Sequence, residues 1–141
     1  MNETGFKIDS KEGPYNTGKE YENGNLGHRP GIKGGYFPVP PVDSEQDMRS
    51  EYLKAMKEMG IKVEKHHHEV APSQHELGMY FGTLVDQADN LQLYKYAVHM
   101  VSNSFGKTAT FMPKPVKGDN GSGMHVHQSI WKGDTALFSG D

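Results

Sequence analysis

The chain has 141 residues, which is enough for one domain of ordinary size and too few for two. Only 34% of the residues are hydrophobic, while 17 are Gly and 8 are Pro, so we expect a loop-rich protein with a small core. The net charge of −3 argues against binding to nucleic acid or to an anionic membrane surface. The sequence has no apolar run long enough to span a membrane and no secretory signal in residues 1–10, so we expect a cytoplasmic protein.

The first part of the chain shows no hydrophobic period of a helix or a strand. Residues 1–35 contain eight Gly and few apolar residues, so we expect them to be either disordered or long loops lying on structure outside this chain. Residues 34–42 hold three Pro, which favour extended backbone but not the interior of a sheet, and this segment is predicted as an edge strand or a rim. The ordered part is expected over residues 36–141.

Two helices are predicted from caps and apolar spacing. Asp43 and Ser44 offer N-cap oxygens, and apolar residues at helical spacing follow over 44–59, up to the helix-terminating Gly60. A second helix begins at Thr83 and keeps one apolar stripe for six turns before Gly106.

Four further strands are predicted, over residues 61–70, 74–81, 107–112 and 124–131. The first two are joined by the turn 71–73, which contains Pro, and the last two by the Gly-rich loop 113–123. The order β-α-β-β-α-β-β predicts an α+β domain whose antiparallel strands carry polar groups on one face.

The histidines are concentrated in two short stretches. Six of the eight lie within residues 64–76 and 125–127, and because the chain has no Cys, any metal must be held by His, Asp or Glu. Strand alternation over 124–131 places His125, His127 and Ser129 on one face, which indicates a shared polar partner. The alternative is a solvated sheet face.

Glu69 and Glu76 flank the turn 71–73, so a hairpin would bring their carboxylates to one point. Paired carboxylates repel unless a cation or a proton lies between them. Oxygen and imidazole ligands without thiolate favour Mg²⁺ or Mn²⁺. The alternative is an incidental His run with two exposed Glu.

The loop 113–123 has the flexibility of a ligand-binding loop. Its glycines allow backbone amides to approach a ligand, and Asn120 supplies a directional amide. The spacing fits neither a Walker loop nor a dinucleotide fingerprint, so on these residues alone a generic loop is the preferred interpretation.

Five sequence blocks together resemble the catalytic domain of type I glutamine synthetase over residues 24–141. They are GGYFPVPPVDS at 34–44, HHEVAPSQHE at 67–76, YKY at 94–96, GKTATFMPKP at 106–115 and GDNGSGMHVHQS at 118–129. The resemblance implies an α+β fold that is part of this catalytic domain, an antiparallel curved sheet with flanking helices, incomplete at both ends.

The resemblance also implies ATP-dependent condensation of glutamate with ammonium through a γ-glutamyl phosphate, in a ring-shaped homo-oligomer with two divalent cations, Mg²⁺ or Mn²⁺. Glu69 and Glu76 match ligands of the metal on the ammonia side, and His125 matches a ligand of the metal beside ATP. Glu69 and Tyr36 match catalytic residues at the ammonium pocket.

Other matched residues are implied to contact substrates. They are His127, Ser129, Glu64, His67 and Phe81 for ATP, and Asn120 and Gly121 for glutamate. Glu64 has the opposite strand parity from Glu69, so a bulge or a rim position is needed to bring both to one site. His28 and His99 match no functional position and are expected to have no such role.

The family pattern extends beyond both ends of this sequence. A Glu-x-Glu metal pair, which residues 1–11 lack, precedes the matched part, and arginines for phosphate and glutamate follow it. Two hypotheses remain: this is a part of a glutamine synthetase, inactive in isolation, or a non-catalytic metal- or nucleotide-binding module. A ligase joining glutamate to another amine and a His-rich metal-sequestering protein are further alternatives.

Overall fold

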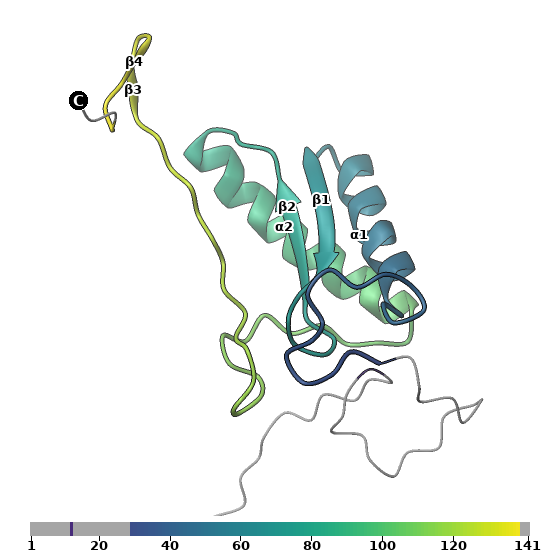
Figure 1. The fold of residues 1–141 in the computed structure, drawn as a ribbon. Helices are drawn as coiled ribbons and strands as arrows, with labels where there is room; N and C mark the ends of the chain where they lie inside the picture. Colours follow the sequence, from purple (N-terminus) through teal and green to yellow (C-terminus); the bar gives the residue numbers. More distant parts are fainter. Residues whose placement is uncertain (1–11, 13–28, 139–141) are drawn as a thin grey trace, which may run out of the picture.

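The computed structural model describes Glu12 and residues 29–138, and its body is a β-hairpin with two helices that pack together against one of its faces (Figure 1). The elements in chain order are α1 (Gln46–Glu58), β1 (Val63–His68), β2 (His75–Met79), α2 (Leu84–Ser104), β3 (Trp131–Lys132) and β4 (Thr135–Ala136). Most of the loop-rich segment predicted over 1–35, including His28, lies outside the described residues. Within the described part, no helix is both long and apolar enough to cross a membrane.

Both predicted helices are confirmed, and local signals explain their limits. The Thr83 hydroxyl accepts a hydrogen bond from the backbone N–H of Asp86 and so caps the start of α2. Gly60 and Gly106 follow the two helices with φ of 86° and 66°, the left-handed conformation that glycine adopts without strain. The start of α1 differs from prediction, since Glu45 is its N-cap residue and no side chain caps it.

The core lies where α1, α2 and one face of the hairpin meet. Its buried members are Met48, Tyr52, Met56, Ile61, Ala97 and Val98, with Val63, Leu77 and Met79 of the hairpin packed against them. The Tyr52 hydroxyl shares a hydrogen bond of 2.7 Å with Ser102 Oγ, which joins α1 to α2 inside this small core. The opposite face of the hairpin is left for polar chemistry.

The predicted hairpin is confirmed as an antiparallel pair of strands. Its register places His67 opposite Glu76 and His68 opposite His75. The turn is closed by a backbone hydrogen bond of 2.7 Å from Glu69 N to Gln74 O. Residues 67 and 69 therefore present their side chains to the same face as residue 76.

Three predicted strands are absent from the described residues. Residues 34–42 form turns, held to the hairpin end by bonds from Gly35 N to Val70 O and from Phe37 N to His68 O. Residues 107–112 and 124–130 belong to no sheet, and only the short β3 and β4 pair beyond them. The reason is physical: an extended segment becomes a strand only beside a partner, and the described residues offer none.

We expect Met56→Ala to lower the free energy of unfolding of the purified chain by about 2–5 kcal/mol, because Met56 is completely buried and its removal leaves a cavity. Met59→Ala is the matched control, since Met59 follows the same helix but is 39% exposed, and it should change stability by less than about 1 kcal/mol. Urea unfolding followed by circular dichroism measures both, and equal losses would contradict the placement of the core.

Candidate metal centre

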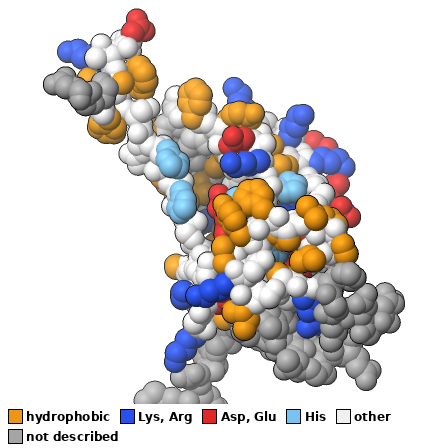
Figure 2. All heavy atoms as spheres, viewed as in Figure 1, with side chains coloured by type: hydrophobic (Ala, Val, Ile, Leu, Met, Phe, Trp, Pro, Cys, Tyr) orange, Lys and Arg blue, Asp and Glu red, His pale blue; other side chains and the backbone are white. Residues whose placement is uncertain are grey.

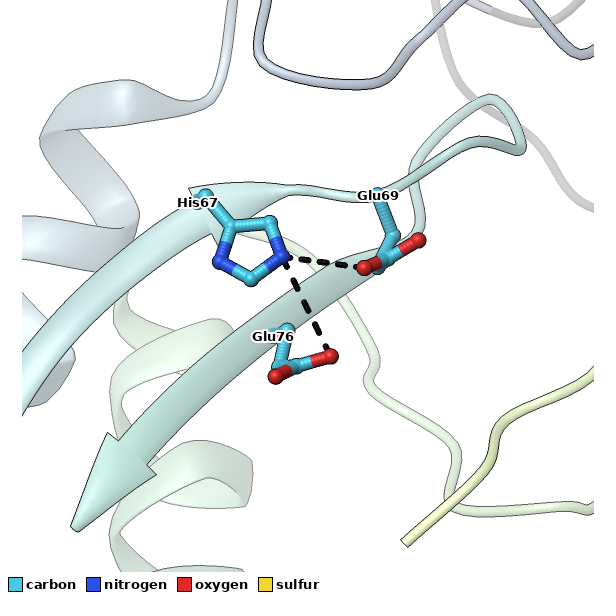
Figure 3. Close-up of side chains that lie close together, drawn as sticks. All are labelled: His67, Glu69 and Glu76. Carbon is cyan, nitrogen blue, oxygen red and sulfur yellow. Dashed lines mark hydrogen bonds and ion pairs between the residues drawn. The ribbon is translucent and has the colours of Figure 1, made fainter. Parts of the chain in front are cut away.

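His67, Glu69 and Glu76 form one cluster on the polar face of the hairpin (Figure 3). One ligand atom from each lies within 4.8 Å of the others. His67 Nε2 donates to Glu69 Oε1 at 2.9 Å and lies 3.9 Å from Glu76 Oε2. Strand register brings Glu76 to His67, and alternation along the chain brings Glu69 to the same face.

The donor set fits a hard divalent cation. Two carboxylates and one imidazole converge without a thiolate, and oxygen-rich sets of this kind suit Mg²⁺ or Mn²⁺. The His67 side chain is 8% exposed, whereas that of Glu76 is 45% exposed, so the cluster opens to solvent on the side of Glu76. Val70 N donates to the second oxygen of Glu69 at 3.0 Å, which orients this carboxylate.

Two aromatic side chains cover His67. The Phe37 ring stacks on the imidazole with a centroid distance of 4.4 Å and an interplanar angle of 5°. Tyr36 meets the same imidazole edge to face at 5.7 Å. Phe37 holds a φ of 54°, a conformation that non-glycine residues rarely adopt, so this turn is built to carry the two rings. Tyr36 thus lies beside His67 of the cluster, and its role at the ammonium pocket stays a prediction.

Glu64 reaches the face of Glu76 through a bulge. The register of β1 and β2 shifts between Val63 and Lys65, so Glu64 and Lys65 share one position opposite Gly78. A Cβ on Gly78 would point to the face of Glu76, two residues earlier, and would lie 3.3 Å from Glu64 Oε2. The bulge that the strand parity requires is therefore present, and it places this carboxylate on the face of the cluster.

The Gly-rich loop is tied to the hairpin turn. Gln74 Nε2 donates to Gly121 O at 2.6 Å, and Ser122 N donates to Pro113 O at 2.9 Å. A Cβ on Gly121 would lie 2.6 Å from Pro113 O, so only glycine fits this approach. Asn120, the neighbour of Gly121, therefore lies near the turn between the two candidate carboxylate ligands.

The structure does not bring the remaining predicted residues to the cluster. His125, His127 and Ser129 are exposed on the extended segment, where Ser129 Oγ accepts a hydrogen bond from Trp131 Nε1. Phe81 follows β2 at the far end of the hairpin and is 97% exposed. In the part of the chain that the structure describes, the only such metal group is His67, Glu69 and Glu76. The roles of these four residues stay predictions.

On the other face of the hairpin, Arg49 makes a buried polar network. Its guanidinium pairs with Asp43 and donates to Nδ1 of both His66 and His75 at 3.3 Å. Burial, assisted by the charge of Arg49, lowers the pKa of His75 to about 3 and also lowers the pKa of His66. Both histidines are therefore neutral hydrogen-bond acceptors that tie the strands to α1.

A buried acid and histidine lie behind the hairpin turn. His68 Nε2 donates to Glu12 Oε2 at 2.7 Å, and both residues are about 1% exposed. Burial would raise the pKa of Glu12, but hydrogen bonds from His68 and Ser44 outweigh it and lower this pKa to about 2. Burial also opposes the charged form of His68, but its hydrogen bond to Glu12 prevails and raises the pKa of His68.

Sequence reasoning missed two features of this region. His67 was expected only near the nucleotide, although it shares strand parity with Glu69, and that alternation is the signal that predicts its place in the cluster. The contact between Glu12 and His68 spans 56 positions of the sequence, and no local pattern indicates it.

Comparison with known proteins identifies the family. The glutamine synthetase catalytic domain matches residues 3–141, and the chain belongs to this family. The glutamine synthetase of Azospirillum brasilense is 66% identical over 141 residues, which are 100% of this chain and 30% of the relative. That of Azorhizobium caulinodans is 70% identical over 138 residues, 98% of this chain and 29% of the relative. The chain thus spans about 30% of the length of these curated relatives.

Two solved structures show the same fold. A cryo-electron microscopy structure of Plasmodium falciparum glutamine synthetase superposes with a TM-score of 0.77 at 36% identity, covering 82% of this chain and 22% of that one. A structure titled "Apo GmaS without ligand" superposes with a TM-score of 0.68 at 30% identity, covering 75% and 25%. The hairpin and the two helices are therefore an α+β part of the glutamine synthetase catalytic fold.

We expect Glu69→Gln to weaken Mn²⁺ binding by the purified chain at least about tenfold, or ~1.4 kcal/mol, because the variant removes one of two carboxylate ligands. Glu58→Gln is the matched control, since Glu58 is an exposed acid at the end of α1. Electron paramagnetic resonance of free Mn²⁺ gives both affinities. Equal affinity of the Glu69→Gln and Glu58→Gln variants would rule out Glu69 as a ligand.

Proposed function

We propose that this chain is part of an ATP-dependent glutamate–ammonia ligase, which makes glutamine through a γ-glutamyl phosphate. The observation that carries the proposal is the His67, Glu69 and Glu76 cluster with Tyr36 beside it, in a chain 66–70% identical to named glutamine synthetases. Two carboxylates on one polar face suit a reaction that takes up ammonium and removes its proton before the ammonia attacks a phosphorylated acid.

The carboxylates of Glu69 and Glu76 hold a divalent cation, Mg²⁺ or Mn²⁺, together with His67. When bound, the cation supplies positive charge to the carboxylate and phosphoryl oxygens, where negative charge grows during transfer. The convergence of all three ligand atoms within 4.8 Å supports this assignment. The second cation, with His125 as a ligand, rests on the family resemblance alone.

Glu69 and Tyr36 form the ammonium side of the site. A carboxylate and an aromatic ring both attract a cation, and both of these side chains contact His67. Glu69 accepts the proton that ammonium loses. The ammonia nitrogen then forms a bond to the acyl carbon of the γ-glutamyl phosphate, and phosphate leaves with the electrons of the broken C–O bond and takes up the second proton from that nitrogen.

The substrate contacts complete the proposal. Asn120 and Gly121 bind glutamate, and the bond from Gln74 to Gly121 supports a place for them beside the cluster. The ATP residues are those named from the family, His127, Ser129, Glu64, His67 and Phe81, and the bulge at Glu64 supports one of them. The ring-shaped homo-oligomer and the cytoplasmic location stay predictions.

A chimera tests the proposed function. The 141 residues of this chain replace the matching 30% of the Azospirillum brasilense glutamine synthetase. With ATP, glutamate, ammonium and Mn²⁺, we expect the chimera to form glutamine, and Glu76→Gln in the chimera to lower kcat/KM at least about a hundredfold, or ~2.7 kcal/mol, through loss of a metal ligand.

Glutamine formation and phosphate release are measured with ammonium. A parallel assay replaces ammonium with methylamine and measures the methylamide and phosphate. A folded chimera that forms only the methylamide would overturn the choice of amine. A folded chimera without any turnover would overturn the ligase proposal. Glu58→Gln, on the exposed end of α1, is the control that should retain the parent rate.

We also expect the isolated 141-residue chain to form no glutamine under the same conditions, because the matched metal pair and the phosphate-binding arginines of the family lie outside this sequence. Measurable turnover by the isolated chain, removed by Glu69→Gln, would contradict this expectation.

A further inference from the structure

The carboxylate of Glu12 joins three segments behind the candidate metal centre. It accepts hydrogen bonds from Ser44 N at 3.0 Å and Ser44 Oγ at 2.7 Å, just before α1. It also accepts one from Ser73 N at 3.1 Å in the hairpin turn, and one from His68 Nε2 at 2.7 Å at the end of β1. A buried carboxylate with this many donors is a fixed point rather than a mobile surface group.

His68 links the anchored Glu12 carboxylate to the backbone of Glu69. Its Nε2 faces Glu12, and its Nδ1 donates to the backbone carbonyl oxygen of Glu69 at 2.6 Å. A histidine with an acceptor at each ring nitrogen cannot rotate without losing both hydrogen bonds. The imidazole therefore holds the residue whose carboxylate belongs to the metal cluster.

Gly35 lies against the backbone carbonyl oxygen of Glu69. A Cβ on Gly35 would lie 2.7 Å from Glu69 O and 2.8 Å from His68 Cε1, so no side chain fits there. Gly35 N donates to Val70 O, and the next residue is Tyr36. The Glu69 backbone is thus enclosed between His68 and the turn that carries the aromatic residues of the site.

We propose that His68, anchored by Glu12, is a positioning residue of this site, which aligns the Glu69 carboxylate with His67 and Glu76. The proposal rests on the proposed function, because it assigns a task to the metal cluster. The ring nitrogens of His68 bond to the Glu12 carboxylate and to the backbone carbonyl of Glu69, so His68 acts through the backbone of Glu69 and not on its carboxylate. Groups that hold metal ligands in place change metal affinity by 10- to 100-fold when they are removed.

Two substitutions separate the two hydrogen bonds of His68. The amide nitrogen of Gln reaches the place of Nε2, so His68→Gln keeps the bond to Glu12 and loses the bond to Glu69 O. The amide nitrogen of Asn reaches the place of Nδ1, so His68→Asn keeps the bond to Glu69 O and leaves the buried Glu12 carboxylate without this donor. We therefore expect His68→Gln to affect metal affinity and His68→Asn to affect stability.

The experiment uses the chimera and Mn²⁺ as the probe. We expect His68→Gln to raise the Mn²⁺ dissociation constant roughly 10- to 100-fold, with a melting temperature near that of the parent and a kcat that returns toward the parent value at saturating Mn²⁺. His68→Asn should lower the melting temperature more than His68→Gln does. His99→Gln, on the exposed side of α2, is the control that should change neither quantity.

Unchanged Mn²⁺ affinity in folded His68→Gln would overturn the proposal. If His68→Gln does not fold, Gly35→Ala decides, because the added Cβ would lie 2.7 Å from Glu69 O and 2.8 Å from His68 Cε1 and so disturbs the contact between them without removing His68 or Glu12; unchanged Mn²⁺ affinity there is equally a refutation. Mn²⁺ affinity is measured without turnover. A parent chimera that binds Mn²⁺ but forms no glutamine would therefore contradict the proposed function but not the positioning role of His68.

Discussion

Antiparallel pairing places His67 directly opposite Glu76, and the rest of the structure depends on this register. On one face it collects His67, Glu69 and Glu76, and on the other it turns Leu77 to the core. A slip by one residue would exchange the two faces, moving the carboxylates into apolar surroundings and the core residues into solvent. Fold and chemistry are therefore specified by one set of strand contacts.

The hairpin is held by different forces at its two ends. Near Val63 and Met79 it packs against the apolar core of the two helices. Near the turn, charged groups replace apolar ones: Arg49 contacts His66 and His75, and Glu12 contacts His68 on the same face. A buried charge is costly unless its partner and hydrogen bonds are in place, so these groups tolerate few alternative arrangements. The end that carries the candidate metal centre is thus the end with the more directional contacts.

Most of the body was predictable because its signals are local. Thr83, Gly60 and Gly106 mark helix ends through their own conformations. The bulge at Glu64 was predictable because Glu64 and Glu69 have opposite strand parity. The strands predicted over 107–112 and 124–131 failed because pairing depends on a partner segment and not on alternation alone. Whether these two segments become strands depends on long-range contacts, which a local pattern does not indicate.

For the candidate site, the carboxylates Glu69 and Glu76 were predictable from their spacing around the turn, and the structure brings them together as expected. The place of Glu12 was not, because its contacts depend on how a distant segment folds back over the hairpin. The choice of Tyr36 rests on the family pattern, whereas the contact of the Tyr36 and Phe37 rings with His67 follows from the turn geometry at Phe37.

The extended segment before β3 has a consequence for handling the chain. Met124, Val126 and Ile130 alternate with polar residues and are more than half exposed, on a backbone that joins no sheet ladder in the described part of the chain. Hydrophobic side chains are exposed along this segment in Figure 2. A row of open backbone donors and acceptors with one apolar side is a template for another strand. This segment therefore offers the isolated chain an edge for strand pairing that is separate from the core around Met56, on which folding depends.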